Sequence, residues 1–196
     1  MTAFRLGLTG SIGMGKSTTA ALFREQGIAV WDADAAVHRL YAPGGAAVAP
    51  LASLCPEAAV AGAIDRGILR RWIASDDSAL SQIEAIVHPL VARDRAEFAQ
   101  RAAGDLLVFD IPLLFEKGTE AELDATLLVT APAAVQRARV LARPGMTEQQ
   151  FRLILSRQMP DADKRARATH IVETLTLDQT RAYVHALIAH IRGPHA

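Results

Sequence analysis

The stretch Gly10-Ser11-Ile12-Gly13-Met14-Gly15-Lys16-Ser17 constrains the fold of this chain more than any other feature. It fits the pattern G-x-x-x-x-G-K-[ST], in which backbone N–H groups converge on phosphate and the lysine reaches the β- and γ-phosphates. Its flanks agree, because residues 5–9 are predicted to form a buried strand and residues 17–26 an amphipathic helix. A glycine-rich turn before an ordinary helix is the simpler alternative, but it needs neither the lysine nor the serine. The stretch therefore predicts a phosphate-binding loop.

Length and charge limit what can surround this loop. The chain has 196 residues, which suits one α/β core with a small insertion. Its 21 basic and 21 acidic residues balance, so we expect no nucleic-acid partner. Cys55 is the sole cysteine and is expected to be a buried apolar residue. No apolar run approaches the length of a membrane span, and we expect a cytoplasmic monomer or weak homo-oligomer.

Two acidic residues follow the second expected strand, residues 28–31. Asp32 and Asp34 lie where ligands gather in doubly wound sheets, beyond the carboxyl end of a strand. On an extended backbone their side chains point to opposite sides, so we expect them to have different roles. A helix N-cap followed by a solvated acid explains the same pair equally well, and both interpretations stay open on these residues alone.

About seventy residues separate Asp34 from the next recognisable strand, far more than a crossover helix needs. Helices are expected over residues 66–74 and from about residue 78 to 103, with a kink at Pro89. In the second of these helices, Leu80, Ile83, Ile86 and Val87 share one face. We expect residues 37–103 to form a helical substrate-binding insertion, with the nucleotide-binding core in residues 1–36 and 104–196.

A third strand, residues 106–110, ends in an acid after a run of apolar residues. This is the pattern of a Walker-B strand, whose acid points at the metal ion beside a bound nucleotide. Asp110 and the hydroxyl of Ser17 are therefore the candidate ligands of Mg²⁺. A helix cap or turn is the alternative role for Asp110.

Arginines mark the region after the fourth expected strand, residues 125–130. Arg137, Arg139 and Arg143 are expected on one helix that breaks at a Pro-Gly pair, with Arg139 and Arg143 on the same face. Thr147 and Gln150 predict a capping box for a further helix through about residue 159. Residues 137–165 are thus a candidate lid whose guanidinium groups close on phosphates, although a solvated basic face gives the same pattern.

The expected fold is α/β, a doubly wound five-stranded parallel sheet with a helical insertion and a helical lid. A fifth strand is expected at residues 170–172 and a closing helix at residues 177–191. No N-K-x-D guanine-binding motif is present, and Asp110 is followed by Ile and Pro in place of a second acid. The layout favours a small-molecule phosphotransferase with Asp34 as the general base, since such an enzyme must close over its substrates to exclude water.

The chain resembles the dephospho-CoA kinase family over nearly its whole length. The resemblance rests on motifs in a fixed order, which are Thr9 to Thr18, Asp32-Ala33-Asp34 with Arg39, Asp65-Arg66 with Leu69-Arg70, His88-Pro89, Asp110 to Glu116, the Arg139–Arg143 pair and Gln158-Met159. It implies transfer of the γ-phosphoryl group of ATP to the ribose 3′-hydroxyl of dephospho-CoA with Mg²⁺, the last step of coenzyme A synthesis.

Carried over residue by residue, the resemblance implies a catalytic set, an ATP site and a substrate site. The catalytic set is Asp34, Lys16 and Arg139. ATP-binding residues are Gly10, Gly13, Met14, Gly15, Lys16, Ser17, Thr18, Arg139 and Arg143. Substrate-binding residues are Thr9, Asp34, Arg39, Arg66, His88, Asp110 and Leu114. Without the resemblance, His88 before a proline is more typical of a packed or capping histidine.

The chain departs from the family pattern after the last expected strand. The family usually has an Asp-Asn-Ser-Gly-like segment near the adenine, and residues 172–176 read Val-Glu-Thr-Leu-Thr here. Two alternatives to a dephospho-CoA kinase stay open. One is a kinase of this architecture acting on another nucleotide or a small hydroxyl compound, and the other is a nucleotide-binding switch without phosphotransfer, which would not need Asp34.

Overall fold

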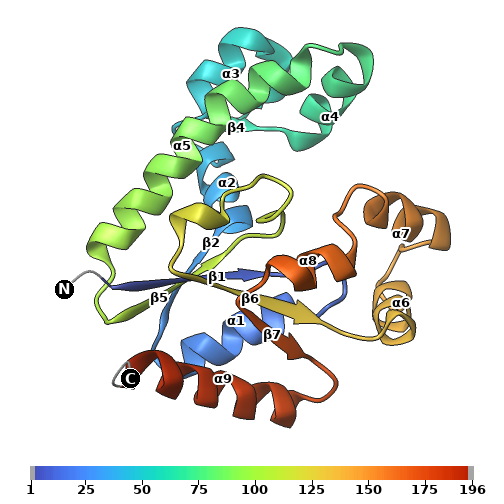
Figure 1. Cartoon of the computed structure of the whole chain (residues 1–196). Coiled ribbons are helices and arrows are strands. Elements are labelled where there is room, and N and C mark those ends of the chain that lie inside the picture. The colour runs from blue at the N-terminus through green and yellow to red at the C-terminus, as the bar shows by residue number, and fades with distance from the viewer. Residues whose placement is uncertain (1–2, 194–196) are drawn as a thin grey trace. The chain divides into compact units, whose positions relative to one another are not determined.

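The computed structural model describes residues 3–193, and within it the chain divides into two compact units (Figure 1). The first unit contains the chain up to Trp31 together with the chain from Ala102 onward. The second unit is the continuous segment Asp32–Arg101. Each unit has a hydrophobic core of its own.

The first unit is built on a five-stranded sheet in the order β2-β5-β1-β6-β7. Its strands are β1 (Phe4–Thr9), β2 (Ala29–Asp32), β5 (Leu106–Asp110), β6 (Ala125–Thr130) and β7 (His170–Glu173). The central strand β1 pairs in parallel with both neighbours, so that Leu6 lies opposite Val108 on β5 and Ala125 on β6. The predicted parallel α/β fold is confirmed, and the carboxyl ends of these strands share one edge.

Two helices, α1 (Lys16–Glu25) and α9 (Leu177–Arg192), pack side by side against one face of this sheet (Figure 1). Their apolar stripes meet alternate strand residues in the main core, where Phe23 and Val184 are fully buried beside Leu6 and Leu8. Side chains alternate along each strand, so the next residues face the opposite side, where Leu114 and Phe115 are buried.

Three further helices follow β6 in the first unit: α6 (Ala133–Leu141), α7 (Glu148–Leu155) and α8 (Asp161–Arg167), with the short η2 turn (Glu120–Glu122) earlier in the chain. The predicted capping box of α7 is present, because Thr147 and Gln150 bond each other reciprocally. The predicted single helix through Arg143 is wrong. Helix α6 ends at Leu141, two residues earlier, so Arg139 and Arg143 do not share a helix face.

The second unit contains five helical segments and a small hairpin. These are α2 (Ala33–Tyr41), α3 (Val48–Leu54), η1 (Pro56–Ala58), β3 (Ala59–Val60), β4 (Ala63–Ile64), α4 (Arg66–Ser75) and α5 (Ala79–Arg101). Its core gathers Leu40, Leu51, Leu69 and Ile83, and the buried Cys55 belongs to it as expected.

Two details of the second unit differ from the sequence expectation. Residues 59–64, for which no strand was expected, form an antiparallel hairpin with Ala61 (φ 50°) and Gly62 (φ 79°) at its tip. Two left-handed residues in a two-residue loop match the right-handed twist of paired strands. Leu80, expected on the buried face of α5, keeps 49% of its surface exposed, whereas Ile83 and Val87 are buried.

None of the helices within residues 3–193 combines the length and the apolar character that crossing a bilayer requires.

Candidate active site

The phosphate-binding loop connects β1 to the N-terminus of α1. Gly13 and Gly15 have φ angles of 77° and 92°, a backbone conformation that residues other than glycine rarely adopt. Helix α1 begins at Lys16, directly after the left-handed Gly15, so its first N–H groups face out of the loop. The hydroxyl-bearing residues Ser17 and Thr18 are exposed in this first turn. This arrangement is suited to hold an anion at the helix N-terminus.

Lys16 forms an ion pair with Asp110, the last residue of β5. Asp110 is only 2% exposed, whereas the Lys16 side chain retains 17% of its surface. A buried carboxylate is costly without a cation, so each group stabilises the charge of the other. The two residues that sequence reasoning assigned to phosphate and metal therefore lie together at the carboxyl edge of the sheet.

Two other predicted substrate-binding residues of this unit lie in its interior. The hydroxyl of Thr9 donates to the carbonyl of Pro112 at 3.3 Å and is fully buried. Leu114 is also fully buried. Both hold the segment after β5 against the end of β1, next to the phosphate-binding loop.

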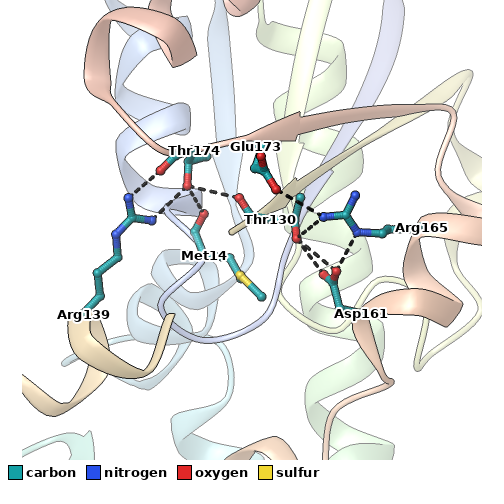
Figure 2. Close-up of polar contacts among 7 residues, drawn as sticks. All are labelled: Met14, Thr130, Arg139, Asp161, Arg165, Glu173 and Thr174. Carbon is teal, nitrogen blue, oxygen red and sulfur yellow. Dashed lines mark hydrogen bonds and ion pairs between the residues drawn. The ribbon is translucent and has the colours of Figure 1, made fainter. Parts of the chain in front are cut away.

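Arg139 is bound to the segment that follows β7 (Figure 2). Its guanidinium donates to Thr174 Oγ1 at 3.0 Å and to the Thr174 carbonyl. The Thr174 hydroxyl donates in turn to the Met14 carbonyl at 2.7 Å, inside the phosphate-binding loop. Arg139 and the loop are thus joined through one threonine, which lies in the segment where the sequence departs from the pattern it otherwise resembles. Sequence reasoning missed this role.

A second polar cluster occupies the ends of β6 and β7 (Figure 2). Thr130, fully buried, donates from its hydroxyl to Asp161 Oδ1 at 2.9 Å, and Arg165 donates to Asp161 Oδ2 at 2.7 Å. Arg165 also lies 3.8 Å from Glu173. This cluster fastens the start of α8 to the sheet. The only sequence signal for it was a threonine at the end of an apolar strand.

The remaining arginines near α6 have different surroundings. Arg137 pairs with Glu148 of α7 at 2.8 Å, and hydrogen bonds from Arg137, followed by those from Arg152, keep the pKa of Glu148 below its usual value. Arg143 lies exposed in the bend after α6. Within the candidate lid, only Arg139 among these three is bonded toward the phosphate-binding loop.

A buried ion pair follows the Asp110-Ile111-Pro112 segment. Lys164 of α8 is completely buried, and its Nζ lies 2.8 Å from Oε1 of Glu116. The same oxygen accepts the N–H of Met159 at 2.9 Å. Burial alone raises the pKa of the Glu116 carboxyl, but the bonds from Lys164 and Met159 outweigh burial and lower it. Glu116 is therefore an ionised anchor for the turn between α7 and α8.

In the second unit, Asp32 and Asp34 separate into different roles. The Asp32 carboxylate accepts the Ala35 N–H at 2.9 Å and caps α2. Asp34 lies in the first turn of α2, not on extended backbone, and is exposed. The capping interpretation thus explains Asp32, and it leaves the carboxylate of Asp34 on the surface of its unit.

The cationic residues predicted for the substrate are also exposed. Arg39 of α2 forms a two-bond contact with Asp94 of α5, the shorter bond measuring 2.6 Å. His88 of α5 lies 3.6 Å from Glu84, one helical turn earlier. Arg66 is the first residue of α4, and its charge partly offsets the burial that raises the pKa of the Tyr41 hydroxyl. Arg66 therefore lies near Tyr41 within this unit.

The described residues contain no cluster of three or more His, Cys, Asp or Glu side chains that could bind a metal ion by itself. Mg²⁺ prefers oxygen ligands and often uses only one or two protein side chains together with substrate phosphates and water. The exposed hydroxyl of Ser17 and the carboxylate of Asp110 fit that pattern chemically. They suit a metal ion that arrives with its nucleotide.

Comparison with known proteins decides the family. A sequence model of the dephospho-CoA kinase family, CoaE, matches residues 4–178. The chain belongs to the dephospho-CoA kinase family. The dephospho-CoA kinase of Cereibacter sphaeroides is 70% identical over 192 residues, which cover 98% of both chains. That of Ruegeria pomeroyi is 58% identical and covers 97% of this chain and 96% of its own.

A solved structure shares this fold over nearly the whole chain. TT1252 from Thermus thermophilus is 39% identical, covers 98% of this chain and all of its own, and superposes with a TM-score of 0.88. The protein is accordingly an ATP-dependent kinase that phosphorylates dephospho-CoA in coenzyme A synthesis. The family decides against a kinase for another acceptor and against a switch without phosphotransfer. The individual roles of the site residues follow as proposals.

Proposed function

We propose that this dephospho-CoA kinase transfers the γ-phosphoryl group of ATP to the ribose 3′-hydroxyl, with Asp34 as the general base. The ribose oxygen attacks the γ-phosphorus, the bond from phosphorus to the β–γ bridging oxygen breaks, and ADP leaves. Asp34 accepts the hydroxyl proton. The exposed position of its carboxylate supports this role, because a general base must reach the acceptor.

The observation that carries the proposal is the Lys16–Asp110 pair beside the glycine loop. Asp110 holds Lys16 at the mouth of the loop, so the cation is placed where the phosphates would bind. On ATP binding, Lys16 exchanges Asp110 for the β- and γ-phosphates, and the loop amides from Gly13 to Thr18 bind the rest. Arg139, bonded to Thr174 beside the loop, adds charge stabilisation.

Mg²⁺ completes the proposed site. When bound with ATP, it neutralises the phosphate oxygens as charge shifts toward ADP. Ser17 and Asp110 are its proposed protein ligands, because Asp110 becomes available when Lys16 turns to the phosphates. Activity should disappear with EDTA and return with Mg²⁺. Ser17→Ala should raise the Mg²⁺ concentration that half-restores it, and an unchanged requirement would remove Ser17 as a ligand.

The second unit, Asp32–Arg101, is the proposed dephospho-CoA-binding part, and residues 137–165 the lid. The exposed cations of the second unit, Arg39, Arg66 and His88, suit the phosphate groups of dephospho-CoA. We propose a cytoplasmic enzyme, where ATP is supplied, that is a monomer or weak homo-oligomer. Sedimentation over a range of protein concentrations tests the last point, and a concentration-independent dimer would contradict it.

The position of phosphorylation is tested by product analysis. Dephospho-CoA and its 3′-deoxy analogue are each incubated with ATP, Mg²⁺ and enzyme, and products are identified by phosphorus NMR. Dephospho-CoA should yield a 3′-phosphomonoester, and the analogue should yield none while still binding. Phosphorylation of the analogue at another hydroxyl would overturn the assignment of the acceptor.

A further inference from the structure

Both backbone groups of Ile12, within the phosphate-binding loop, are bonded to glutamine side chains from outside the loop. The Ile12 N–H donates to Oε1 of Gln158 at 3.1 Å. Nε2 of Gln136 donates to the Ile12 carbonyl at 2.8 Å. A backbone N–H only donates and a carbonyl only accepts, so each contact fixes which end of its glutamine amide faces the loop. The two glutamines therefore have opposite and non-interchangeable polarities.

Gln136 is a rigid support because it is 5% exposed and lies on α6. The same helix contacts the next residue of the loop. A Cβ on Gly13 would lie 2.5 Å from Cγ2 of Val140, which leaves room only for glycine. Helix α6 thus packs directly on the loop, and the Gln136 amide satisfies a loop carbonyl that the packing places beside it.

Gln158 is supported in a different way, through the turn between α7 and α8. Its neighbour Met159 donates its N–H to Glu116 Oε1 at 2.9 Å, and the buried Lys164 pairs with the same oxygen. Glu116 thereby anchors the C-terminal end of the turn that carries Gln158, together with the helix α8 that follows it. The contacts form a chain from Glu116, through this turn, to the Ile12 N–H and the loop.

We propose that Gln158 and Gln136 are positioning residues that set the orientation of the phosphate-binding amides. The inference rests on the proposed binding of ATP phosphates by this loop. Gly13 and Gly15 give the loop several accessible backbone conformations, and only one of them directs the following N–H groups at phosphate. Hydrogen bonds to the N–H and the carbonyl of Ile12 select that conformation before ATP arrives. ATP binding then does not have to supply the free energy of ordering the loop.

The opposite polarities allow a test that separates positioning from charge and from packing. Glu and Met are each placed at both positions, since both are close in size to Gln. At residue 158, Glu keeps an acceptor for the Ile12 N–H and Met does not. At residue 136, Glu places an anion against the Ile12 carbonyl, whereas Met only removes a donor. The rank order of ATP affinity should therefore reverse between the two positions.

Dissociation constants for ATP and for adenosine are measured by calorimetry on each variant, with the unfolding midpoint of the ligand-free protein. We expect Gln158→Met to weaken ATP binding about tenfold and Gln158→Glu by less than about threefold. We expect Gln136→Glu to weaken ATP binding at least about tenfold more than Gln136→Met does. Adenosine, which has no phosphates, should bind all four variants like the wild type.

Two results would overturn the proposal. If Glu is worse than Met at both positions, the effect is general repulsion of phosphate. If ATP affinity is unchanged and only the unfolding midpoint falls, the glutamines are merely structural. If a variant of the buried Gln136 fails to fold, the two Gln158 variants still test the proposal. The losses of about tenfold for Gln158→Met and of less than about threefold for Gln158→Glu are predicted independently of Gln136. Failure of the wild type to bind ATP would instead contradict the proposed function.

Discussion

The two units hold their candidate site residues in contrasting ways. In the first unit, Lys16, Asp110 and Arg139 are each bonded to a neighbour within the site, and Asp110 is buried. In the second unit, Asp34 is exposed, and the exposed Arg39 and His88 lie against the half-buried acids Asp94 and Glu84. The proposed nucleotide side is therefore preorganised around a buried carboxylate, whereas the proposed acceptor side presents exposed side chains.

This contrast indicates which interactions stabilise the transition state and which contribute to substrate affinity. Preorganised donors cost no reorganisation when charge develops, which suits the phosphoryl group in the transition state. Exposed arginines lose side-chain entropy when they close on a ligand, so they contribute affinity at a cost. Substitutions of the bonded first-unit residues should consequently lower kcat, and those of the exposed cations in the second unit should mainly raise the KM for dephospho-CoA.

The largest effect is expected for Lys16→Met. Loss of the cation removes phosphate neutralisation and the ion pair with the buried Asp110, so kcat/KM should fall about 10²–10³-fold. Steady-state kinetics measure the fall, and Lys117→Met, a surface change after the Asp110 segment, is the control. Near-normal activity of the Lys16 variant would contradict a preorganised phosphate site.

Arg139→Ala should lower kcat by about 10–10²-fold, because the guanidinium beside the loop is lost. Arg137→Ala on the same helix should leave kcat unchanged, since Arg137 pairs with Glu148 away from the loop. Denaturant unfolding is measured for both variants. A loss of folding stability without a loss of kcat per folded molecule would make Arg139 a structural residue.

In the second unit, Arg66→Ala should raise the KM for dephospho-CoA about tenfold and leave the KM for ATP within about twofold. The matched control is Arg101→Ala, which removes an exposed arginine paired with Glu97 at the end of α5. Initial rates with each substrate varied in turn separate the two constants. Equal changes in the KM for dephospho-CoA and the KM for ATP would contradict the assignment of dephospho-CoA binding to the second unit.

The smallest effect concerns pH and a pair of histidines in the first unit. Burial, with a smaller contribution from His190 at a ring distance of 6.1 Å, lowers the pKa of His170. The unfolded chain then binds the proton more readily, so stability should fall as pH drops from 7 through about 6.5 and level off below the lowered pKa.

His170→Gln should flatten this part of the stability curve, as measured by denaturant unfolding between pH 7 and 5.5. His185→Gln, an exposed change on α9, should leave the slope in place. A slope that persists in the His170 variant would show that another group causes it.

The strands and the loop could be predicted because their signals are local. Apolar runs mark β5 and β6, and the spaced glycines mark the loop. Arg143 was misplaced because the helix already ends two residues before it, ahead of the Pro-Gly break. The hairpin at Ala61 and Gly62 was missed because its strands have only two residues each.

The supporting residues of the site could not be predicted for a different reason. Gln136, Gln158 and Thr174 act through contacts with residues more than thirty positions away, such as the 2.7 Å bond from Thr174 to Met14. No local pattern identifies which polar side chain meets a distant backbone group. Gln158 lies in a motif shared with the family, yet its role is visible only in its contact with Ile12.

The role of Asp34 as the general base of phosphoryl transfer is tested most directly by Asp34→Asn in a single-turnover reaction. ATP and dephospho-CoA affinities are measured by calorimetry on the same protein. The substitution keeps size and polarity but removes the proton acceptor. We predict near-wild-type affinities with phosphoryl transfer slowed about 10²-fold or more. Unchanged transfer at saturating substrates would contradict the assignment of Asp34 as the base.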